Sequence, residues 1–290
     1  KLINKTIIAT SDEFEDDLLA KVVSKENKLF LYRGDEKNVL SRFYYVSKKE
    51  KADIIVRLTG DCPLIDHSII DQAIETLIIK NVDYVSNTIK RTYPDGLDVE
   101  VFKSSALYAA FKNVKDSYSR EHVTPYIHGM NKQVAKKGNF KKFSLEYIAN
   151  FSYLRWTLDE EKDLEVIREI FNKIDPKASW QEILALVMKR PFIQMRNQII
   201  NTNEGSDHYG DDINKRYKNS NIFFKRAIKS VPLGSQTFSK SFIQWPKGAS
   251  PLFIERGYGG KTVDIDGNSY VDYVLGLLPI TLGYCDVDVD

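Results

Sequence analysis

The stretch IIVRLTGDCPLID, residues Ile54–Asp66, decides the fold. Its apolar, largely β-branched opening passes directly into Gly60-Asp61-Cys62-Pro63, which is typical of a buried strand that ends in a turn. In parallel α/β sheets, ligands bind outside the carboxyl ends of the strands. Asp61 could there hold Mg²⁺ against a polyphosphate, because hard cations prefer oxygen ligands. The same letters also fit a plain strand-to-turn transition in which Gly60 and Asp61 serve only the geometry.

Short apolar runs alternate with amphipathic stretches on both sides of this strand. Two helices carry a cap signal, with Asp71 three residues after Ser68 and Glu182 three after Ser179. The alternation predicts an α/β sandwich with a largely parallel sheet. Strands are expected at Thr6–Ala9, Leu29–Tyr32, Asp53–Leu58, Tyr84–Ser86 and Leu97–Phe102, and helices at Glu13–Ser24, Val39–Lys48, Ser68–Lys80, Leu158–Ile174 and Ser179–Lys189.

Composition places the chain among globular proteins. It has 290 residues, 42% hydrophobic and 28% charged, which suggests about two domains. The formal net charge of +2 gives no global electrostatic footprint for nucleic acid or a membrane surface. No uninterrupted apolar run reaches the length of about 18 residues that a membrane-spanning helix needs. Cys62 and Cys285 fit no metal or disulfide framework, so a reducing, cytoplasmic setting is expected.

A second informative stretch is RWTLDEEKDL, residues Arg155–Leu164. Asp159 stands where a strand-like run passes into a helix, so it could be a second metal ligand. Alternatively, Thr157 and Glu160 form a capping box, and the acidic residues there suit the positive end of the helix. Both interpretations stay open on spacing alone.

Two further stretches carry clustered polar residues. In YPDGLDVEV, residues Tyr93–Val101, Asp98 and Glu100 would share one face of a strand. Paired carboxylates there can bind sugar hydroxyls or exchange protons, or they can simply form an exposed polar face. Arg120-Glu121-His122 could form a charged pocket rim, although His122 could equally be a satisfied surface or core histidine.

The composition shifts after the second predicted cap. Residues 196–220 are rich in Asn, Asp, Gly and Lys, which predicts a linker between domains. Beyond it, Ile222–Ser230 is expected to be a short helix. Thr262–Tyr273 is expected to be a hairpin that turns at Asp266-Gly267, a favoured hairpin dipeptide. About seventy residues are too few for a complete enzyme domain.

Five motifs occur in a fixed order, VRLTGDCPLID, YVSNT, YPDGLDVEVF, REHVTPYI and LRWTLDEEKDLEVI. With them, residues 1–195 resemble the cytidylyltransferase-like proteins of spore-coat and surface polysaccharide biosynthesis, relatives of the enzymes that make CMP-activated acid sugars. The resemblance implies a Rossmann-like, three-layer α/β fold of the nucleotide-diphospho-sugar transferase type. It also implies Mg²⁺-dependent transfer of a nucleotide from CTP to a sugar or sugar-like acceptor, with release of pyrophosphate.

The resemblance also implies roles for particular residues. Asp61 and Asp159 match the two metal-binding, catalytic aspartates of the family and its acid-sugar relatives. The nucleotide would lie near Thr10, Ser11, Asp12, Gly60 and Asp61. The acceptor would lie toward Asp95, Asp98, Glu100, Arg120, Glu121 and His122.

One feature of the family is absent. Its members open with a strand and a basic Gly/Ser/Arg loop that ends in a Lys and cradles the triphosphate. We therefore expect a domain that lacks its first β-loop-α unit, of roughly 30–40 residues, with an exposed sheet edge and impaired activity. Two alternatives follow: a non-catalytic nucleotide-sugar binding or scaffold domain, and a glycosyltransferase of related architecture. A glycosyltransferase would carry an Asp-x-Asp motif where Gly60-Asp61-Cys62-Pro63 has a single Asp.

Residues 221–290 resemble a different family. NIFFKRAIKSVPLGSQTFSK and PLFIERGYGGKTVDIDGNSYVDYVLGLLPITLGY are similar to the opening of a class III aminotransferase of the glutamate-1-semialdehyde aminomutase branch. The resemblance implies an N-terminal fragment of a pyridoxal-phosphate-dependent domain whose cofactor lysine would lie beyond Asp290. No residue here is therefore assigned to pyridoxal phosphate. The expected partners are CTP and a sugar acceptor, not nucleic acid or a membrane, and a homodimer is the assembly to test.

Overall fold

The structure, a computed structural model, describes residues 2–130, 137–190, 192–197, 216–231, 234–235, 240, 251–274, 280, 282–286 and 288. The chain divides into two units, Lys1–Leu186 and Val187–Asp290. Most of the predicted linker, residues 198–215, lies outside the described residues. The boundaries predicted at 195 and 220 stay predictions.

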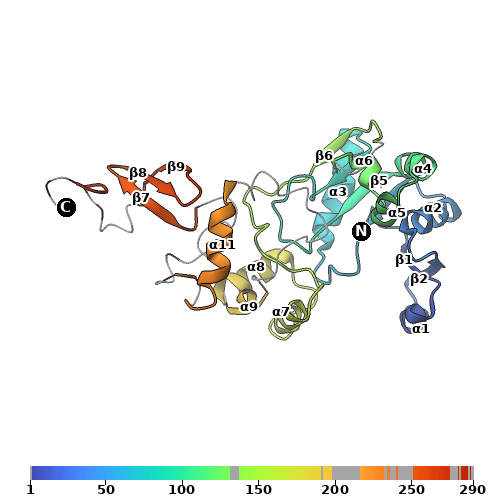
Figure 1. The fold of residues 1–290 in the computed structure, drawn as a ribbon. Coiled ribbons are helices and arrows are strands. Elements are labelled where there is room, and N and C mark those ends of the chain that lie inside the picture. Colours follow the sequence, from blue (N-terminus) through green and yellow to red (C-terminus); the bar gives the residue numbers. More distant parts are fainter. Residues whose placement is uncertain are drawn as a thin grey trace. The chain divides into compact units, whose positions relative to one another are not determined.

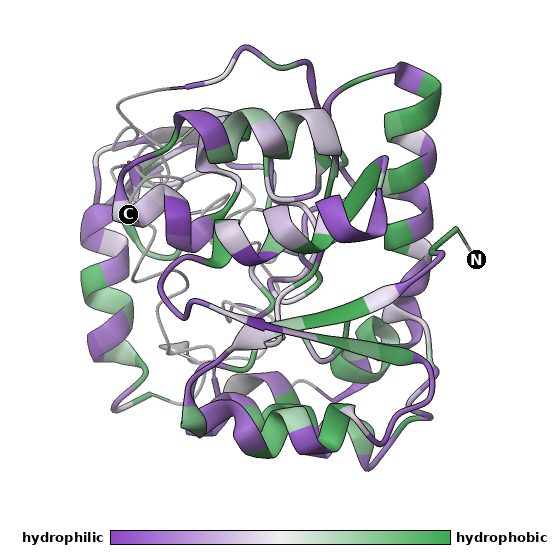
Figure 2. Ribbon diagram, turned by 90° about the vertical axis from the view of Figure 1, so that its right-hand side faces the viewer, coloured by the Kyte–Doolittle hydropathy of each residue, from purple (hydrophilic) through white to green (hydrophobic). Residues whose placement is uncertain are grey.

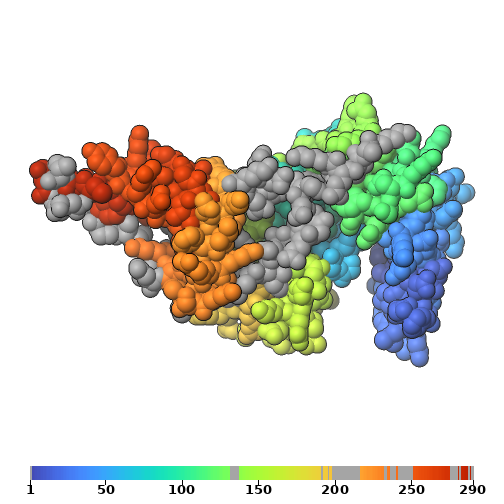
Figure 3. Space-filling view, viewed as in Figure 1, coloured from blue at the N-terminus to red at the C-terminus, as the bar shows by residue number. Residues whose placement is uncertain are grey.

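The first unit opens with a parallel pair of strands, β1 (Thr6–Ser11) and β2 (Leu29–Gly34). The 3-10 turn η1 (Phe14–Asp16) and helix α1 (Asp17–Val23) connect them, as the crossover between parallel strands requires (Figure 1). The sequence predicted both strands, and each extends two residues beyond its predicted end. This segment is coloured dark blue in Figure 3. Several of its apolar side chains are exposed: Phe14, Leu18, Leu19, Val22 and Phe30.

A four-stranded sheet in the order β3-β5-β4-β6 follows. It consists of β3 (Ile54–Arg57), β4 (Tyr84–Ser86), β5 (Glu100–Lys103) and β6 (Lys142–Ser144). Strand β5 runs antiparallel to β3 and β4, whereas β4 and β6 are parallel. The sheet is therefore mixed, and the prediction of a largely parallel sheet is wrong for its centre. No helix lies between β4 and β5, so the chain turns back beside its neighbours instead of crossing over.

Strand β5 begins later than predicted because the preceding residues bond elsewhere. The Asn87 amide donates to the Leu97 carbonyl and accepts from Val99 N. The backbone of Asp95 pairs with the segment around Arg155, through Asp95 N to Leu154 O at 2.9 Å and Trp156 N to Asp95 O at 2.6 Å. Those bonds draw the 93–99 segment away from the sheet and toward the segment that contains Asp159.

Helices α2 (Val39–Glu50), α3 (His67–Lys80), α4 (Ser104–Asn113), α5 (Ser117–His122) and α6 (Pro125–His128) lie around this sheet. Further along the chain come α7 (Glu161–Phe171), α8 (Trp180–Lys189) and α9 (Phe192–Met195), the last of which belongs to the second unit. Apolar and polar residues alternate along them, as expected for helices with one buried face (Figure 2). Helix α3 is capped by Asp66, not by the predicted Ser68. Asp66 has the extended conformation that a cap requires and accepts a bond from Ser68 N at 2.6 Å.

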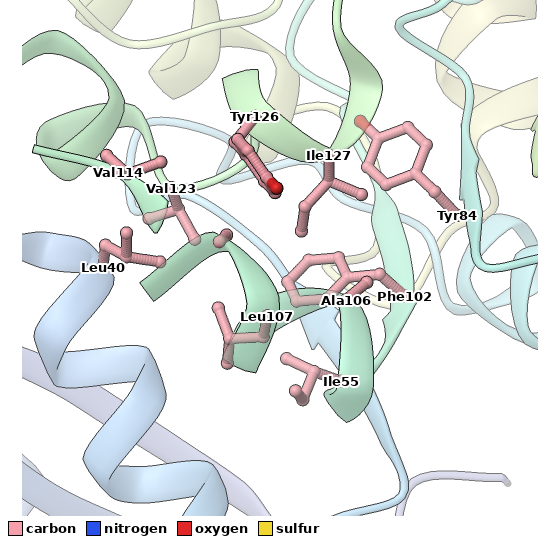
Figure 4. Close-up of a cluster of buried hydrophobic side chains, with 11 residues drawn as sticks. Leu40, Ile55, Tyr84, Phe102, Ala106, Leu107, Val114, Val123, Tyr126 and Ile127 are labelled. Carbon is pink, nitrogen blue, oxygen red and sulfur yellow. The ribbon is translucent and has the colours of Figure 1, made fainter. Parts of the chain in front are cut away.

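The hydrophobic core of the first unit lies between the sheet and helices α2, α4 and α6 (Figure 4). Each large apolar side chain buried there contributes about 1.5–3 kcal/mol of stability. The residues of this core cluster come from α2, the sheet, α4, α6 and the segments beside them, so the cluster joins these elements into one body. They are Leu40, Ile55, Tyr84, Phe102, Ala106, Leu107, Ala110, Val114, Val123, Tyr126 and Ile127.

The second unit contains helix α11 (Lys218–Ala227) and an antiparallel sheet of β7 (Ile254–Tyr258), β8 (Lys261–Asp264) and β9 (Ser269–Val271). The predicted hairpin turn at Asp266-Gly267 is present, and Gly267 has a φ of 86°. The Asp266 carboxylate accepts bonds from Asn219 N and Ser220 N, which caps α11. That cap explains why the helix begins before the predicted Ile222. Within the described residues, every helix is too short or too polar to cross a membrane.

Candidate functional site

The backbone brings the two predicted metal-binding aspartates into adjacent segments. Asp61 follows β3 by four residues, at the carboxyl end of that strand. The Asp61 carbonyl accepts a bond from Leu158 N at 2.8 Å and from the Thr157 hydroxyl at 3.2 Å. The segment that carries Asp159 therefore lies directly along the loop after β3.

Arg155 holds two carboxylates of different burial. Its Nε and Nη2 donate to the two carboxylate oxygens of Asp163, at 2.9 and 2.7 Å, and the Asp163 side chain is fully buried. Nη2 also contacts Asp159 at 2.9 Å, but 49% of the Asp159 side chain is exposed. Asp163 is thus enclosed by protein, whereas about half of the Asp159 side chain is open to solvent.

The capping box of α7 involves other residues than predicted. Glu160 is the cap and Asp163 its partner, whereas the sequence predicted Thr157 with Glu160. The helix begins at Glu161, and the Thr157 hydroxyl donates to the Asp61 carbonyl instead. The Asp159 carboxylate takes no part in this box, which removes the capping explanation for that residue.

Asp95 and Asp98 share a second arginine that the sequence did not single out. Arg91 makes a two-pronged contact with Asp98, at 3.0 and 2.8 Å, and also contacts Asp95 at 3.2 Å. Burial raises the pKa of Asp95 to about 6, and the nearby Asp98 adds to this rise while Arg91 opposes it. Asp95 can therefore exchange a proton close to neutral pH.

We call these residues the aspartate cluster: Asp61, Asp95, Asp98, Asp159, Asp163, Arg91 and Arg155. Its carboxylates outnumber its guanidinium groups, so it attracts cations. In the part of the chain that the structure describes, no three His, Cys, Asp or Glu side chains converge closely enough to hold a metal alone. That arrangement fits Mg²⁺, which usually takes one or two protein carboxylates together with substrate phosphates.

Glycine serves two different purposes beside this cluster. Gly96 has a φ of 104°, and a Cβ there would lie 2.4 Å from Thr157 N. The close approach of these two segments therefore requires glycine. At Gly60, by contrast, no atom of the described residues, apart from its own chain neighbours, lies within 4 Å of the place of a Cβ. The described part of the protein therefore has room for a side chain at position 60.

The three residues predicted near the nucleotide follow one another at the end of β1. The Thr10 and Ser11 hydroxyls both donate to Asp16 Oδ2, at 2.5 and 2.6 Å. These bonds lower the pKa of Asp16 to about 2. Asp12 is exposed and donates its N–H to Gly34 O at 3.0 Å. No described contact joins these residues to the aspartate cluster, so their role stays a prediction.

Glu100 lies in a separate, buried network. One of its oxygens accepts bonds from the Tyr84 and Thr124 hydroxyls, both at 2.6 Å, and the other pairs with Arg57. Asp98 precedes the strand and faces Arg91, so the structure does not unite Asp98 and Glu100 as a carboxylate pair.

The remaining predicted residues, Arg120, Glu121 and His122, lie at the end of α5. Arg120 Nη2 donates to Val114 O at 3.4 Å, and Glu121 is exposed. The His122 ring centroid lies 4.3 Å from that of Tyr118, and partial desolvation lowers the pKa of His122. The charge of Arg57 also lowers that pKa, whereas Glu121 and Glu100 raise it.

The sheet, its flanking helices and the aspartate cluster define an α/β protein of the nucleotidyltransferase type. The cytidylyltransferase family model matches residues 1–205, so the chain belongs to that family. It is 31% identical over 189 residues to the spore coat polysaccharide biosynthesis protein SpsF of Bacillus subtilis, a match that covers 64% of this chain and 75% of SpsF. A solved cytidylyltransferase from Leptospira borgpetersenii superposes with a TM-score of 0.60 at 28% identity, over 65% of this chain and 77% of that one.

A separate similarity concerns another class of enzyme. A glutamate-1-semialdehyde 2,1-aminomutase of Geobacillus kaustophilus is 37% identical over 75 residues. The match covers 26% of this chain and only 17% of the aminomutase. It agrees with the aminotransferase resemblance noted in the sequence.

Proposed function

We propose that the chain transfers a cytidylyl group from CTP to a sugar or sugar-like acceptor in surface polysaccharide biosynthesis, with release of pyrophosphate. Family membership supports the class of reaction. The observation that carries the site is the bond from Leu158 N to the Asp61 carbonyl, which brings Asp61 and Asp159 into adjacent segments at the end of β3.

In this proposal each carboxylate has a distinct task. Asp61 and Asp159 would hold Mg²⁺, which, when bound, neutralises charge on the phosphates. The acceptor hydroxyl attacks the α-phosphorus in line, one P–O bond forms, and the bond to pyrophosphate breaks. Asp95 is the candidate to take the hydroxyl proton, since a pKa of about 6 is close to the optimum for a general base at neutral pH.

Binding and turnover together test this proposal. Mg²⁺ with millimolar CTP should raise the thermal midpoint of the protein, and Asp61→Asn and Asp159→Asn should abolish that shift. Asp83→Asn is the matched control, because Asp83 pairs with Lys103 at the opposite edge of the sheet. Pyrophosphate release is then measured over a panel of sugars and sugar acids. A wild-type protein that shows neither a shift nor release would refute the proposal.

The charge of the site favours one alternative, a nucleotide-sugar binding or scaffold domain without catalysis. Within the described aspartate cluster both arginines are already paired with carboxylates, so neither is free to stabilise a pentacovalent phosphorus. A thermal shift with CTP or a nucleotide sugar, but no pyrophosphate release with any acceptor, would support this alternative.

We further propose that residues 221–290 are the opening part of a pyridoxal-phosphate-dependent aminotransferase or aminomutase domain. The similarity to the aminomutases supports it. Activities of both kinds on one chain would fit the synthesis of an amino sugar that is then activated with CTP.

A further inference from the structure

Arg57 is a cation that pairs with none of the carboxylates of the aspartate cluster. It lies at the carboxyl end of β3, the strand that leads to Asp61. It is the last residue of β3, four residues before Asp61. In the register of the sheet it lies directly opposite Glu100, with which its Nη1 pairs. Among the described residues no other side chain or carbonyl accepts a bond from its guanidinium, and 18% of the side chain stays exposed. Arg57 therefore has N–H groups to offer to a ligand.

Glu100 is held as an ionised carboxylate beneath Arg57. Burial alone would raise its pKa, but Arg57, Thr124 and Tyr84 together bring the pKa below its usual value. Replacing a buried ion pair with apolar residues of similar volume is often neutral or stabilising. A gain in stability is therefore a weak explanation for the Arg57–Glu100 pair. A specific explanation is that Glu100 fixes the direction of the Arg57 guanidinium.

The backbone beside this ion pair is strained at Val123. Val123 has φ 69° and ψ −56°, and Thr124 N bonds to His122 O at 2.8 Å, which is a γ-turn of the rare, strained kind. Val123 is β-branched and fully buried, so the conformation is costly. The turn directs the Thr124 hydroxyl to Glu100, although Thr124 stands at the cap of α6, where its side chain makes no cap bond.

We propose that Arg57 binds an oxyanion of a substrate, either a nucleotide phosphate or a carboxylate of the acceptor. Glu100 and Thr124 are positioning residues that hold its guanidinium for this purpose. The inference deepens the proposed function, since it supplies that site with a cation outside the negatively charged aspartate cluster. Glu100 then acts through Arg57 and does not touch the acceptor.

The test measures the affinity of the full chain for inorganic pyrophosphate and for glucuronate by calorimetry at low ionic strength. We expect Arg57→Met to weaken one of them about tenfold or more, since a charged hydrogen-bonding group is lost. A loss confined to pyrophosphate identifies a phosphate as the ligand, and a loss confined to glucuronate identifies a carboxylate. Lys103→Met is the matched control, because it removes one cation from the opposite edge of the same sheet and should leave both affinities unchanged.

Two further variants separate positioning from simple structural support. Thr124→Val should lower the affinity for the same ligand about threefold. Thr124→Ser, which keeps the hydroxyl, should retain the wild-type affinity. The proposal is overturned if folded Arg57→Met binds both probes within twofold of wild type, or if the wild-type protein binds neither. The thermal shift with CTP and Mg²⁺ is measured in parallel. Absence of both this shift and pyrophosphate release would refute the proposed function, whereas a shift together with unaltered affinities in Arg57→Met would refute only the role of Arg57.

Discussion

At the scale of single residues, burial separates two carboxylates that share one arginine. Asp159 and Asp163 are both aspartates that contact the same nitrogen of Arg155. Asp163 is enclosed and also accepts bonds from the backbone of Asp159 and Glu160. Asp159 is half exposed. The two residues should therefore respond differently to the same substitution.

We expect Asp163→Ala to lower the free energy of unfolding by about 3–5 kcal/mol, because it leaves the buried Arg155 without its main partner. Asp159→Ala should cost less than about 1 kcal/mol, as for an exposed ion pair, but should abolish the thermal shift with CTP and Mg²⁺. Urea unfolding of both variants checks this. Equal losses of stability would show that the two carboxylates do not differ in this way.

Asp95 should give the protein an unusual dependence on pH. Its pKa is about 6 in the folded state, against about 3.8 for an ordinary aspartate, so between these pH values the folded state binds more protons than the unfolded state. Stability from this residue therefore falls as the pH rises from about 4 to about 6. Relative to Asp95→Asn, the wild-type protein should lose about 2–3 kcal/mol over that window, measured by urea unfolding at each pH. Parallel curves for the two proteins would contradict the raised pKa.

At the scale of secondary-structure elements, one carboxylate links two helices. Asp66 caps α3 through Ser68 N, and its other oxygen accepts a bond from Trp180 N at the start of α8, at 2.7 Å. Asp66 and Trp180 are both buried. The first turn of α8 is thereby fixed to the first turn of α3.

Asp66→Ala should lower the free energy of unfolding by about 2–4 kcal/mol, because a cap is lost and the buried Trp180 N–H loses its acceptor. Ser68→Ala removes only an exposed hydroxyl from the same cap and should cost less than about 1 kcal/mol. Thermal unfolding of the two variants compares them. If Ser68→Ala were as damaging as Asp66→Ala, then Ser68 would be the effective cap.

The elements that the sequence predicted well are those whose signals are local. The apolar run of β3, the α8 capping pair Ser179 and Glu182, and the Asp266-Gly267 turn each lie within a few residues, and all three occur in the structure. The direction of β5 and the roles of Arg57, Arg91 and Arg155 were missed. Their partners are set by how distant segments meet, such as Asp95 beside Arg155, and a single sequence carries no signal of that meeting.

At the scale of the whole molecule, the second unit has its own polar centre. The Tyr270 hydroxyl donates to Asp264 at 2.8 Å, and Asn268 also contacts this carboxylate. Asp266 caps α11 from the hairpin turn, so helix and hairpin hold each other in place within this unit. The nucleotide site that we propose uses residues of the first unit alone.

The two units should therefore respond separately. Phe224→Ala removes a buried side chain of α11 and should destabilise the second unit by about 3–5 kcal/mol, while the affinity for CTP and Mg²⁺ stays within twofold of wild type. Calorimetric unfolding with and without nucleotide measures both effects. A large loss of nucleotide affinity would mean that the second unit contributes to the site.

The contrast between Gly60 and Gly96 bears on how this sequence can change through descent. A mutation at codon 96 faces rejection in every lineage, whatever the chain does, because the Thr157 backbone occupies the space that any side chain needs. The described part of the fold places no such constraint on codon 60. If related genes nevertheless keep glycine at codon 60, a bound molecule that passes close to this backbone would explain its retention. Drift to alanine in one lineage would then mark the loss of that molecule.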